Sequence, residues 1–373
     1  MDPGLGRLRF PVDGSRGRRY PELPHRYRNA FQRDRDRIIH ARAFRRLEDK
    51  TQVFPAGISD HFRNRLTHTM EVSQIARTVA AVLQLDEDLT EALALAHDFG
   101  HPPFGHAGEE ELNRQMLLFS DTFNHNLHAL RIVESFEQRY ARFPGLNLTF
   151  EIREGIVKHS MDFLPGQFPE LDQYLPGLRP PLEAQLIDLA DEIAYNTADL
   201  DDGFSAGILS NDSIAAAVPA FASIQETIEF QFPGASERLR FLEVLRLLVD
   251  HLATGLIEGT MQAALASGAE THDDVRRHPA RLASLSTPSS ETNGQLKNFL
   301  HSALYNSPAL LEERSRSSAL ISAMFQFFLS EPSQLPEPYR GMTETSPVHR
   351  VVCDYIAGMT DGFLLRAARS LTR

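Results

Sequence analysis

Two side chains that can bind a metal ion lie next to each other where an apolar helical segment ends. His97 and Asp98 close the run EALALAHD, and Gly100, Pro102 and Pro103 follow directly. Glycine and proline end a helix, so the two polar side chains are expected to project at the break. An imidazole beside a carboxylate offers the nitrogen and oxygen ligands that divalent transition metals bind. The pair therefore predicts part of a metal site.

Two further candidate ligands lie in other helical segments. His68 lies about one helix earlier in NRLTHTMEV, and Asp191 lies later in LIDLADEIAYNTADLDD. With the first pair they make a set of two imidazoles and two carboxylates, which suits Mn²⁺, Fe²⁺, Co²⁺, Ni²⁺ or Zn²⁺, and Mg²⁺ less well. Four protein ligands on an octahedral ion leave positions for water and a phosphate oxygen. Taken alone, a histidine near a helix end is more often a capping or core residue, so the prediction depends on the combination.

The segment after the metal pair carries acid–base side chains. HDFGHPPFGHAGE holds three histidines and two carboxylates in thirteen residues. His106 and Glu109 are three apart and share one helix face, where they could orient and deprotonate a water. His101 could protonate or hydrogen-bond a leaving oxygen, and His125 and His128 are further candidates. The competing interpretation is a histidine-rich solvated turn.

The elements that must position these residues are predicted to be helices. Helical periodicity of apolar residues recurs in residues 30–47, 64–84, 88–99, 107–118, 126–140, 181–200, 235–268, 291–305, 312–330 and 346–371. Asp86 or Asp88 could cap the helix that leads to His97. Two short stretches, 51–54 and 147–151, could pair as a hairpin. The fold class predicted is all-α.

The domain organisation expected is one large helical domain with a C-terminal helical extension. Residues 1–30 are rich in Gly, Pro and Arg and are expected to form a flexible N-terminal arm. Residues 31–210 hold the candidate site residues and are expected to form the core. Residues 211–373 are expected to complete the domain and to make oligomer contacts.

Composition limits the classes of function. The net charge of −12 argues against nucleic-acid or anionic-membrane binding as the main role, but allows an anionic substrate in a local cationic pocket. Cys353 is the single cysteine, which favours a reducing compartment. No apolar run approaches the roughly 20 residues that span a bilayer, and the N-terminus lacks a secretory signal. A cytoplasmic protein without membrane partners is expected.

Four blocks of the chain resemble the deoxyguanosine triphosphate triphosphohydrolase-like family. They are FQRDRDRIIHARAFRRLEDKTQVF (31–54), NRLTHTMEVSQIAR (64–77), ALAHDFGHPPFGHAGE (94–109) and DLADEIAYNTADLDDG (188–203). Weaker matches are REGIVKHS (153–160), LKNFL…LY (296–305) and DYIAGMTD (354–361). The resemblance implies an α-helical HD-domain phosphohydrolase core. It also implies that water attacks the α-phosphorus of a deoxynucleoside triphosphate (dNTP) and releases the deoxynucleoside and inorganic triphosphate.

The resemblance assigns roles to individual residues. The positions that match metal ligands are His68, His97, Asp98 and Asp191. The positions that match catalytic residues are His106, Glu109, His101 and His125. The positions that match substrate-binding residues are Gln52, Arg65, Tyr195 and Asp199. Of these, Arg65 is expected at the phosphates and the other three at the deoxyribose. Tyr195 and Asp199 follow Asp191 at i+4 and i+8, so one helix face would bind both metal and sugar.

The resemblance also implies a cofactor and partners. One divalent ion per site is expected, Mn²⁺, Mg²⁺, Fe²⁺ or Co²⁺. A homo-oligomer is implied, and an activating nucleotide and weak single-stranded DNA binding are allowed. Arg45, Arg46 and Lys50 either form surface salt bridges or grip a phosphate or effector nucleotide through charge-assisted bonds.

The chain departs from the family pattern at a few positions. Leu127 and His128 stand where Ala and Gln are usual, Ala198 where a His is common, and Gly362 where Arg often follows M-T-D. None is a predicted metal ligand, so the departures put base preference and effector response in doubt. Two alternatives stay open. One is an HD-type enzyme acting on nucleoside monophosphates or alarmones, and the other is a nucleotide sensor or single-stranded DNA-binding protein.

Overall fold

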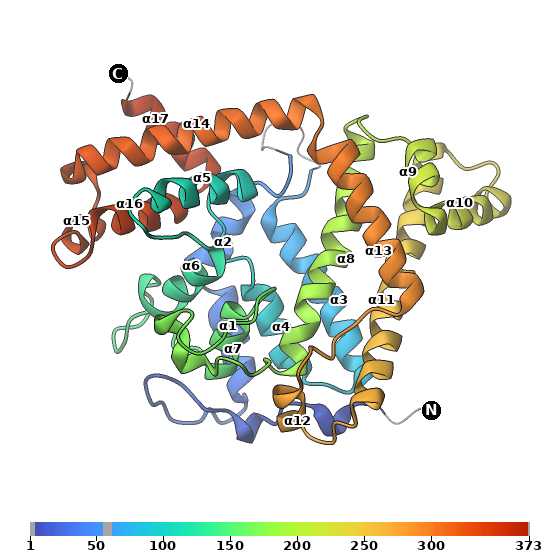
Figure 1. Cartoon of the computed structure of the whole chain (residues 1–373), viewed down its shortest axis with the longest axis horizontal. Coiled ribbons are helices and arrows are strands. Elements are labelled where there is room, and N and C mark those ends of the chain that lie inside the picture. The colour runs from blue at the N-terminus through green and yellow to red at the C-terminus, as the bar shows by residue number, and fades with distance from the viewer. Residues whose placement is uncertain (1–3, 55–61, 372–373) are drawn as a thin grey trace. The chain divides into compact units, whose positions relative to one another are not determined.

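The computed structural model describes residues 4–54 and 62–371. Among these residues the regular elements are all helical, which confirms the all-α prediction (Figure 1). In chain order they are η1 (Gly6–Leu8), η2 (Val12–Gly14), α1 (Ala30–Ile39), α2 (Arg42–Arg46), η3 (Leu47–Asp49), α3 (Arg65–Leu83), α4 (Glu87–Ala96), α5 (Gly105–Leu117), α6 (His125–Arg131), η4 (Ile132–Phe136), α7 (Phe150–Val157), η5 (Pro169–Tyr174), α8 (Leu182–Ser205), α9 (Asn211–Ala217), α10 (Pro219–Gln231), α11 (Glu237–Ser267), α12 (His272–Arg277), α13 (Thr287–Leu300), η6 (His301–Tyr305), α14 (Pro308–Ser330), η7 (Pro332–Gln334), α15 (Tyr339–Met342), α16 (Val348–Ala357) and α17 (Asp361–Leu371). None of the described helices is long and apolar enough to cross a membrane.

The chain divides into two compact units. Unit 1 comprises the described residues of Met1–Arg35, His68–Leu95 and Thr149–Ser307. Unit 2 comprises those of Asp36–Thr67, Ala96–Leu148 and Pro308–Arg373. Both units take segments from either side of residue 210, where we expected the core to give way to the extension, and that boundary stays a prediction.

In unit 1, helices α8, α11 and α13 pack against one another and α10 packs on α11 (Figure 1). The approach between α11 and the start of α13 requires glycine. A Cβ atom on Gly255 would lie 2.0 Å from the Ser289 hydroxyl oxygen, and one on Gly259 would lie 2.3 Å from the Leu285 carbonyl carbon. Any larger residue would push α11 away from α13. This packing holds α8, the helix that carries Asp191.

The N-terminal residues 4–14, part of the expected flexible arm, pack within unit 1. Leu5, Leu8 and Phe10 are buried. The backbone nitrogen of Phe10 donates a 2.9 Å hydrogen bond to the Glu183 carboxylate on α8. Three apolar side chains in a Gly- and Pro-rich stretch are enough to anchor it, because each buried side chain contributes roughly 1.5–3 kcal/mol.

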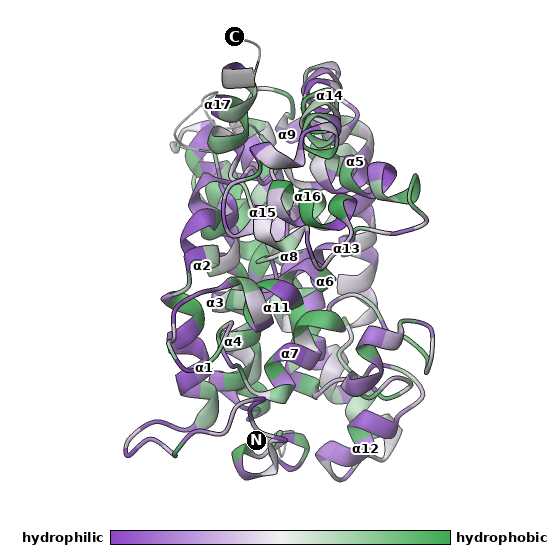
Figure 2. Ribbon diagram, turned by 90° about the vertical axis from the view of Figure 1, so that its left-hand side faces the viewer, coloured by the Kyte–Doolittle hydropathy of each residue, from purple (hydrophilic) through white to green (hydrophobic). Residues whose placement is uncertain are grey.

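Unit 2 is built around an apolar cluster from α5, α14, α16 and α17 (Figure 1). Figure 2 shows hydrophobic and hydrophilic residues on the same helices, as expected for amphipathic helices that bury one face. A Cβ atom on Gly108 would lie 2.0 Å from the Pro103 carbonyl oxygen and 3.0 Å from Ile321 on α14. Gly108 therefore lets α5 pack closely on α14 and on the loop before it.

The strand prediction is wrong. Thr51 and Thr149 form only isolated bridges, with Asn64 and Arg18 respectively. The Asp34 carboxylate accepts hydrogen bonds from the backbone nitrogen of Thr149 at 3.0 Å and from its hydroxyl at 2.6 Å. The Asp34 side chain thus accepts the hydrogen bonds of Thr149 that a neighbouring strand would accept in a sheet. Helix α7 begins at the next residue, Phe150.

Candidate active site

In unit 1, the structure brings two of the predicted metal ligands together. Nε2 of His68, on α3, lies 2.8 Å from Oδ1 of Asp191, on α8. The His68 side chain is buried, whereas the Asp191 side chain is 21 % exposed. A nitrogen and an oxygen donor converge here, as one site for a divalent ion requires.

A second histidine also lies beside Asp191. Nε2 of His159 lies 3.8 Å from Oδ2 of Asp191, and its Nδ1 lies 2.7 Å from Oδ1 of Asp188. The Arg281 guanidinium pairs with Asp188 and donates to the Lys158 carbonyl at 2.6 Å. Asp188 thus fixes the ring of His159 next to Asp191. The sequence signal for this contact was the weak REGIVKHS match, which did not indicate a partner.

The face of α8 that carries Asp191 continues to the predicted sugar-binding residues. Tyr195 is partly buried, and Asp199 is buried and accepts a hydrogen bond from the Tyr305 hydroxyl on η6. Burial, with the nearby carboxylates, raises the pKa values of both tyrosine hydroxyls. Both therefore remain protonated donors at neutral pH. Tyr305 was not among the predicted site residues, although it ends the weak LKNFL…LY match.

In unit 2, Asp98 is held ionised by a cationic neighbour. The Arg65 guanidinium donates to Oδ2 of Asp98 at 2.8 Å, and Nδ1 of His101 lies 2.9 Å from Oδ1. Nε2 of His97 lies 3.5 Å from the same Oδ1. Burial opposes ionisation, but the Arg65 charge and the two imidazoles outweigh it and hold the Asp98 pKa well below its usual value. An ionised carboxylate is the form that binds a metal ion.

The predicted catalytic residues also meet in unit 2, in an arrangement that differs in detail from the prediction. Nδ1 of His106 lies 3.8 Å from Oε2 of Glu109, whereas Nδ1 of His125 lies 2.7 Å from Oε1. The His125 ring stacks on His101 with centroids 3.9 Å apart. Burial opposes ionisation of Glu109, but the neighbouring imidazole of His106 and the hydrogen bond from His125 lower its pKa strongly. Glu109 is thus an anion shared by two imidazoles.

The chain turn before α5 aims these side chains. Phe104 has φ +62° and Gly105 has φ +57°, so both lie in the left-handed region. A Cβ atom on Gly105 would lie 3.0 Å from the Arg65 guanidinium and 3.5 Å from the Gln52 carbonyl oxygen. Gly105 therefore allows Arg65 and Gln52 to approach the start of α5.

Arg45, Arg46 and Lys50 are the three candidate cations for phosphate binding. Of these, Lys50 already makes hydrogen bonds within the protein. Its ammonium donates to the carbonyls of His101 and of Ala357, the latter at 3.3 Å. Burial, with the charges of Arg46 and Arg65, lowers the pKa of Lys50 to about 7. Arg45 is exposed and Arg46 partly buried, so these two are better placed than Lys50 to meet a phosphate from solution.

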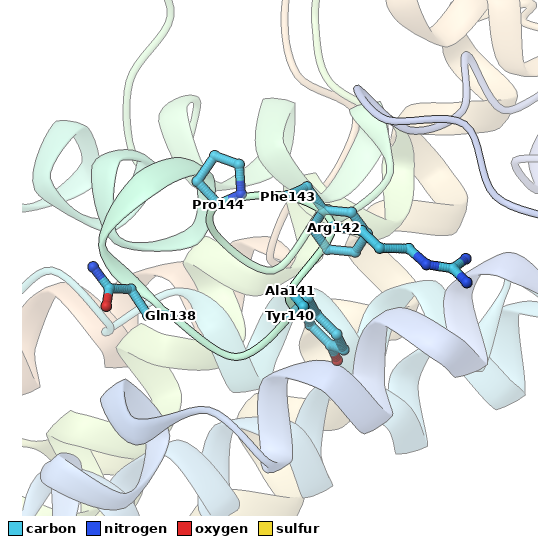
Figure 3. A pocket seen from close by; sticks show the side chains of 6 residues that line it. All are labelled: Gln138, Tyr140, Ala141, Arg142, Phe143 and Pro144. Carbon is cyan, nitrogen blue, oxygen red and sulfur yellow. The ribbon is translucent and has the colours of Figure 1, made fainter.

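An open hollow elsewhere in unit 2 is not part of this site (Figure 3). It is lined by Gln138, Tyr140, Ala141, Arg142, Phe143 and Pro144. Its lining contains no carboxylate or imidazole, so it offers no group that could activate a water.

Comparison with known proteins finds two matching family models and several relatives. The HD domain family model matches residues 65–196, and the phosphohydrolase-associated domain model matches residues 283–370. A protein of Geobacter sulfurreducens is 45 % identical over 361 residues, which are 94 % of this chain and 90 % of the relative. A protein of Caulobacter sp. is 42 % identical over 370 residues, 96 % of this chain and 93 % of the relative. One of Bordetella pertussis is 43 % identical over 361 residues, 96 % of this chain and 93 % of the relative.

All three relatives carry the name deoxyguanosinetriphosphate triphosphohydrolase-like protein. Their similarity extends over nearly the whole chain and includes the blocks that hold the candidate site. The chain therefore belongs to the deoxyguanosinetriphosphate triphosphohydrolase-like family of HD-domain phosphohydrolases.

Proposed function

We propose that the protein hydrolyses dNTPs to the deoxynucleoside and inorganic triphosphate. The observation that carries the proposal is Glu109, a carboxylate held ionised between two imidazoles on the segment that follows His97 and Asp98. Such a group can orient and activate a water. The names of the relatives support the substrate class.

The proposed reaction begins with attack of a water on the α-phosphorus. His106 accepts a proton from that water, and Glu109 stabilises the imidazolium that forms. The bond between the α-phosphorus and the 5′ oxygen of the nucleoside breaks. The 5′ oxygen gains a proton, for which His101 or His125 is the proposed donor. The water oxygen leaves with the triphosphate.

We propose that one divalent ion is held by His68, His97, Asp98 and Asp191. The donor chemistry fits, because His68 and Asp191 converge in unit 1 and Asp98 is held ionised beside His97 in unit 2. Mn²⁺, Mg²⁺, Fe²⁺ and Co²⁺ are the ions proposed. When bound, the ion would supply positive charge to an α-phosphate oxygen and to the attacking water.

The substrate contacts proposed use Arg65, Gln52, Tyr195 and Asp199. Arg65 meets the phosphates with guanidinium nitrogens other than the one bonded to Asp98. Asp199, oriented by Tyr305, hydrogen-bonds the sugar, and Gln52 and Tyr195 lie at the 2′ carbon, where a hydroxyl would not fit. A cytoplasmic homo-oligomer is proposed, with an activating nucleotide and weak single-stranded DNA binding as its further partners.

Product analysis tests this proposal. The purified full chain is given each of the four dNTPs, singly and mixed, with Mn²⁺, Mg²⁺ or Co²⁺, and nucleoside and phosphate products are separated by chromatography. We expect deoxynucleoside and inorganic triphosphate in equal amounts. Orthophosphate or pyrophosphate in place of triphosphate would mean that water attacks another phosphorus and would overturn the proposal. No product with any metal would favour an enzyme acting on nucleoside monophosphates or alarmones, or a nucleotide sensor.

A further inference from the structure

The stretch from the last turn of α16 to the first residue of α17 contacts each chain segment that carries the predicted catalytic residues of unit 2. This stretch, residues 354–361, is the DYIAGMTD match. Its Asp354 carboxylate accepts a 3.0 Å bond from Arg131 and lies 3.4 Å from Nδ1 of His128, both on α6. Its Ala357 carbonyl accepts a bond from Lys50. The last residue, Asp361, makes the contacts with the greatest consequence for α5.

The Asp361 carboxylate bridges two segments with both of its oxygens. Oδ2 accepts hydrogen bonds from the backbone nitrogen of Thr51 at 2.8 Å and from its hydroxyl. Oδ1 accepts a 2.9 Å hydrogen bond from the backbone nitrogen of Phe104. The side chain is buried. Thr51 precedes Gln52, and Phe104 precedes Gly105, the first residue of α5.

Phe104 is the point at which α5 takes its direction. Its φ of +62° is one that residues with a Cβ atom rarely adopt, and it persists only where the surroundings hold it. Its own side chain gives no cap hydrogen bond to α5. The bond from its nitrogen to Asp361 is therefore a direct means of holding this conformation. His106 and Glu109 follow within one and a half turns, so a change at Phe104 would re-aim both.

We propose that Asp361 is a positioning residue for catalysis. By holding Phe104 in its left-handed conformation, it fixes the start of α5 and so the place of His106 and Glu109. By holding Thr51, it fixes the approach of Gln52 to the same turn. The inference rests on the proposed function for its kinetic readout, but its structural readout is independent of any substrate.

The test compares the full-length protein with its Asp361→Asn variant. The side-chain oxygen of Asn can still accept a hydrogen bond from either Thr51 or Phe104. Its NH2 group then faces the other donor, so the hydrogen bonds to one of the two residues are lost. We expect kcat to fall roughly tenfold or more, because small displacements of catalytic groups have effects of this size. KM should rise less than kcat falls, because Gln52 is the one proposed substrate contact that Asp361 helps to place. Asp121→Asn, which removes a carboxylate paired with Arg350 on α16, is the control and should leave kcat near the starting value.

A rescue variant separates positioning from a general loss of stability. Phe104→Gly allows the left-handed conformation without help, so adding it to Asp361→Asn should restore kcat several-fold even though it removes an apolar side chain. If the two substitutions instead multiply their losses, the proposal is wrong. Asp361→Glu, which moves the carboxylate by one methylene, takes the place of Asp361→Asn if the latter does not fold.

Hydrogen exchange gives the readout that needs no substrate. In Asp361→Asn, amides of residues 99–112 should exchange faster than in the unmodified protein, and amides of α11 should not change. Faster exchange without dNTP turnover by the unmodified protein would keep the positioning role and overturn the proposed function. Unchanged exchange with unchanged kcat would overturn the positioning role alone.

Discussion

Nδ1 of His125 lies 2.7 Å from Oε1 of Glu109, which makes this the shorter of the two contacts between that carboxylate and an imidazole. The backbone nitrogen of His125 donates to the same oxygen at 3.0 Å. The other oxygen, Oε2, lies 3.8 Å from Nδ1 of His106. The carboxylate is thus anchored on α6 while its second oxygen faces the exposed imidazole of His106. We interpret Glu109 as the group that holds the imidazole of His106, the proposed water-activating base, in place relative to α6.

Replacing Glu109 by Gln should lower kcat by about 10²-fold or more, because the imidazolium formed on His106 loses its counter-charge. The melting temperature of the variant should stay close to that of the unmodified protein. Glu110→Gln is the matched control, since Glu110 is exposed on the same helix and pairs with Arg314. Steady-state kinetics of the two variants with one dNTP check the prediction. Equal activity in both would show that Glu109 has no part in catalysis.

Removing a proposed metal ligand should remove the metal. Asp191→Ala should lower the bound divalent ion from about one per chain to near zero and abolish turnover, since the ion is proposed to act directly on the α-phosphate. Elemental analysis after dialysis gives the metal content. Glu192→Gln on the same helix, where the carboxylate instead pairs with Lys297 and Asn293, should keep the ion. Full metal content in Asp191→Ala would remove Asp191 from the ligand set.

Tyr305→Phe should weaken substrate binding more than it slows the chemistry. It removes the hydroxyl that donates to the buried Asp199, so the carboxylate loses the orientation proposed for sugar binding. We expect KM for a dNTP to rise roughly tenfold or more, because a hydrogen bond to a charged group contributes about 1.5 kcal/mol or more. Tyr140→Phe, in the hollow of Figure 3, should leave KM unchanged. A rise in KM for Tyr140→Phe alone would place the substrate elsewhere.

Stability should fall with rising pH through the titration of Glu183. Burial raises the pKa of this carboxyl to about 7, although it accepts bonds from the backbone nitrogens of Phe10 and Asp86. The folded protein therefore binds a proton that the unfolded chain releases above its ordinary pKa of 4.5. The contribution of this protonated carboxyl to the free energy of unfolding is complete below pH 4.5, and it is lost as the pH rises through about 7. The loss is on the order of 3 kcal/mol.

Glu183→Gln checks this pH dependence, because its amide oxygen can accept the same two bonds without titrating. Urea unfolding at pH 5 and pH 8 should show the variant gaining stability relative to the unmodified protein at the higher pH. Glu243→Gln, at a position on α11 where the side chain is 43 % exposed, should show no such change. Parallel curves for Glu183→Gln and the unmodified protein would mean that Glu183 is charged in the folded state throughout.

Local features of the fold were predictable from sequence. Asp86 was a predicted cap, and its carboxylate accepts a 2.9 Å bond from the Leu89 nitrogen at the start of α4. The spacing of His106 and Glu109 placed both on one helix face, as observed on α5. These features follow from helix geometry within a few residues. By contrast, no helix was predicted over α9, α10 or α12, because these helices are short or weakly periodic.

Contacts between distant segments could not be predicted in the same way. The pairing of Glu109 with His125, and of Asp199 with Tyr305, joins residues 16 and 106 positions apart. Periodicity within a helix carries no information on which other helix it meets. The hydrogen bond between Asp361 and Phe104 joins residues 257 positions apart and could not be predicted for the same reason. The family resemblance supplied residue roles, but not these partners.

Hydrolysis in ¹⁸O-labelled water tests the central claim most directly. A single dNTP is turned over to completion, and the nucleoside and phosphate products are analysed by mass spectrometry. Attack of water on the α-phosphorus predicts one ¹⁸O atom in inorganic triphosphate and none in the deoxynucleoside. Label in the nucleoside 5′ hydroxyl, or in orthophosphate or pyrophosphate in place of triphosphate, would contradict the account.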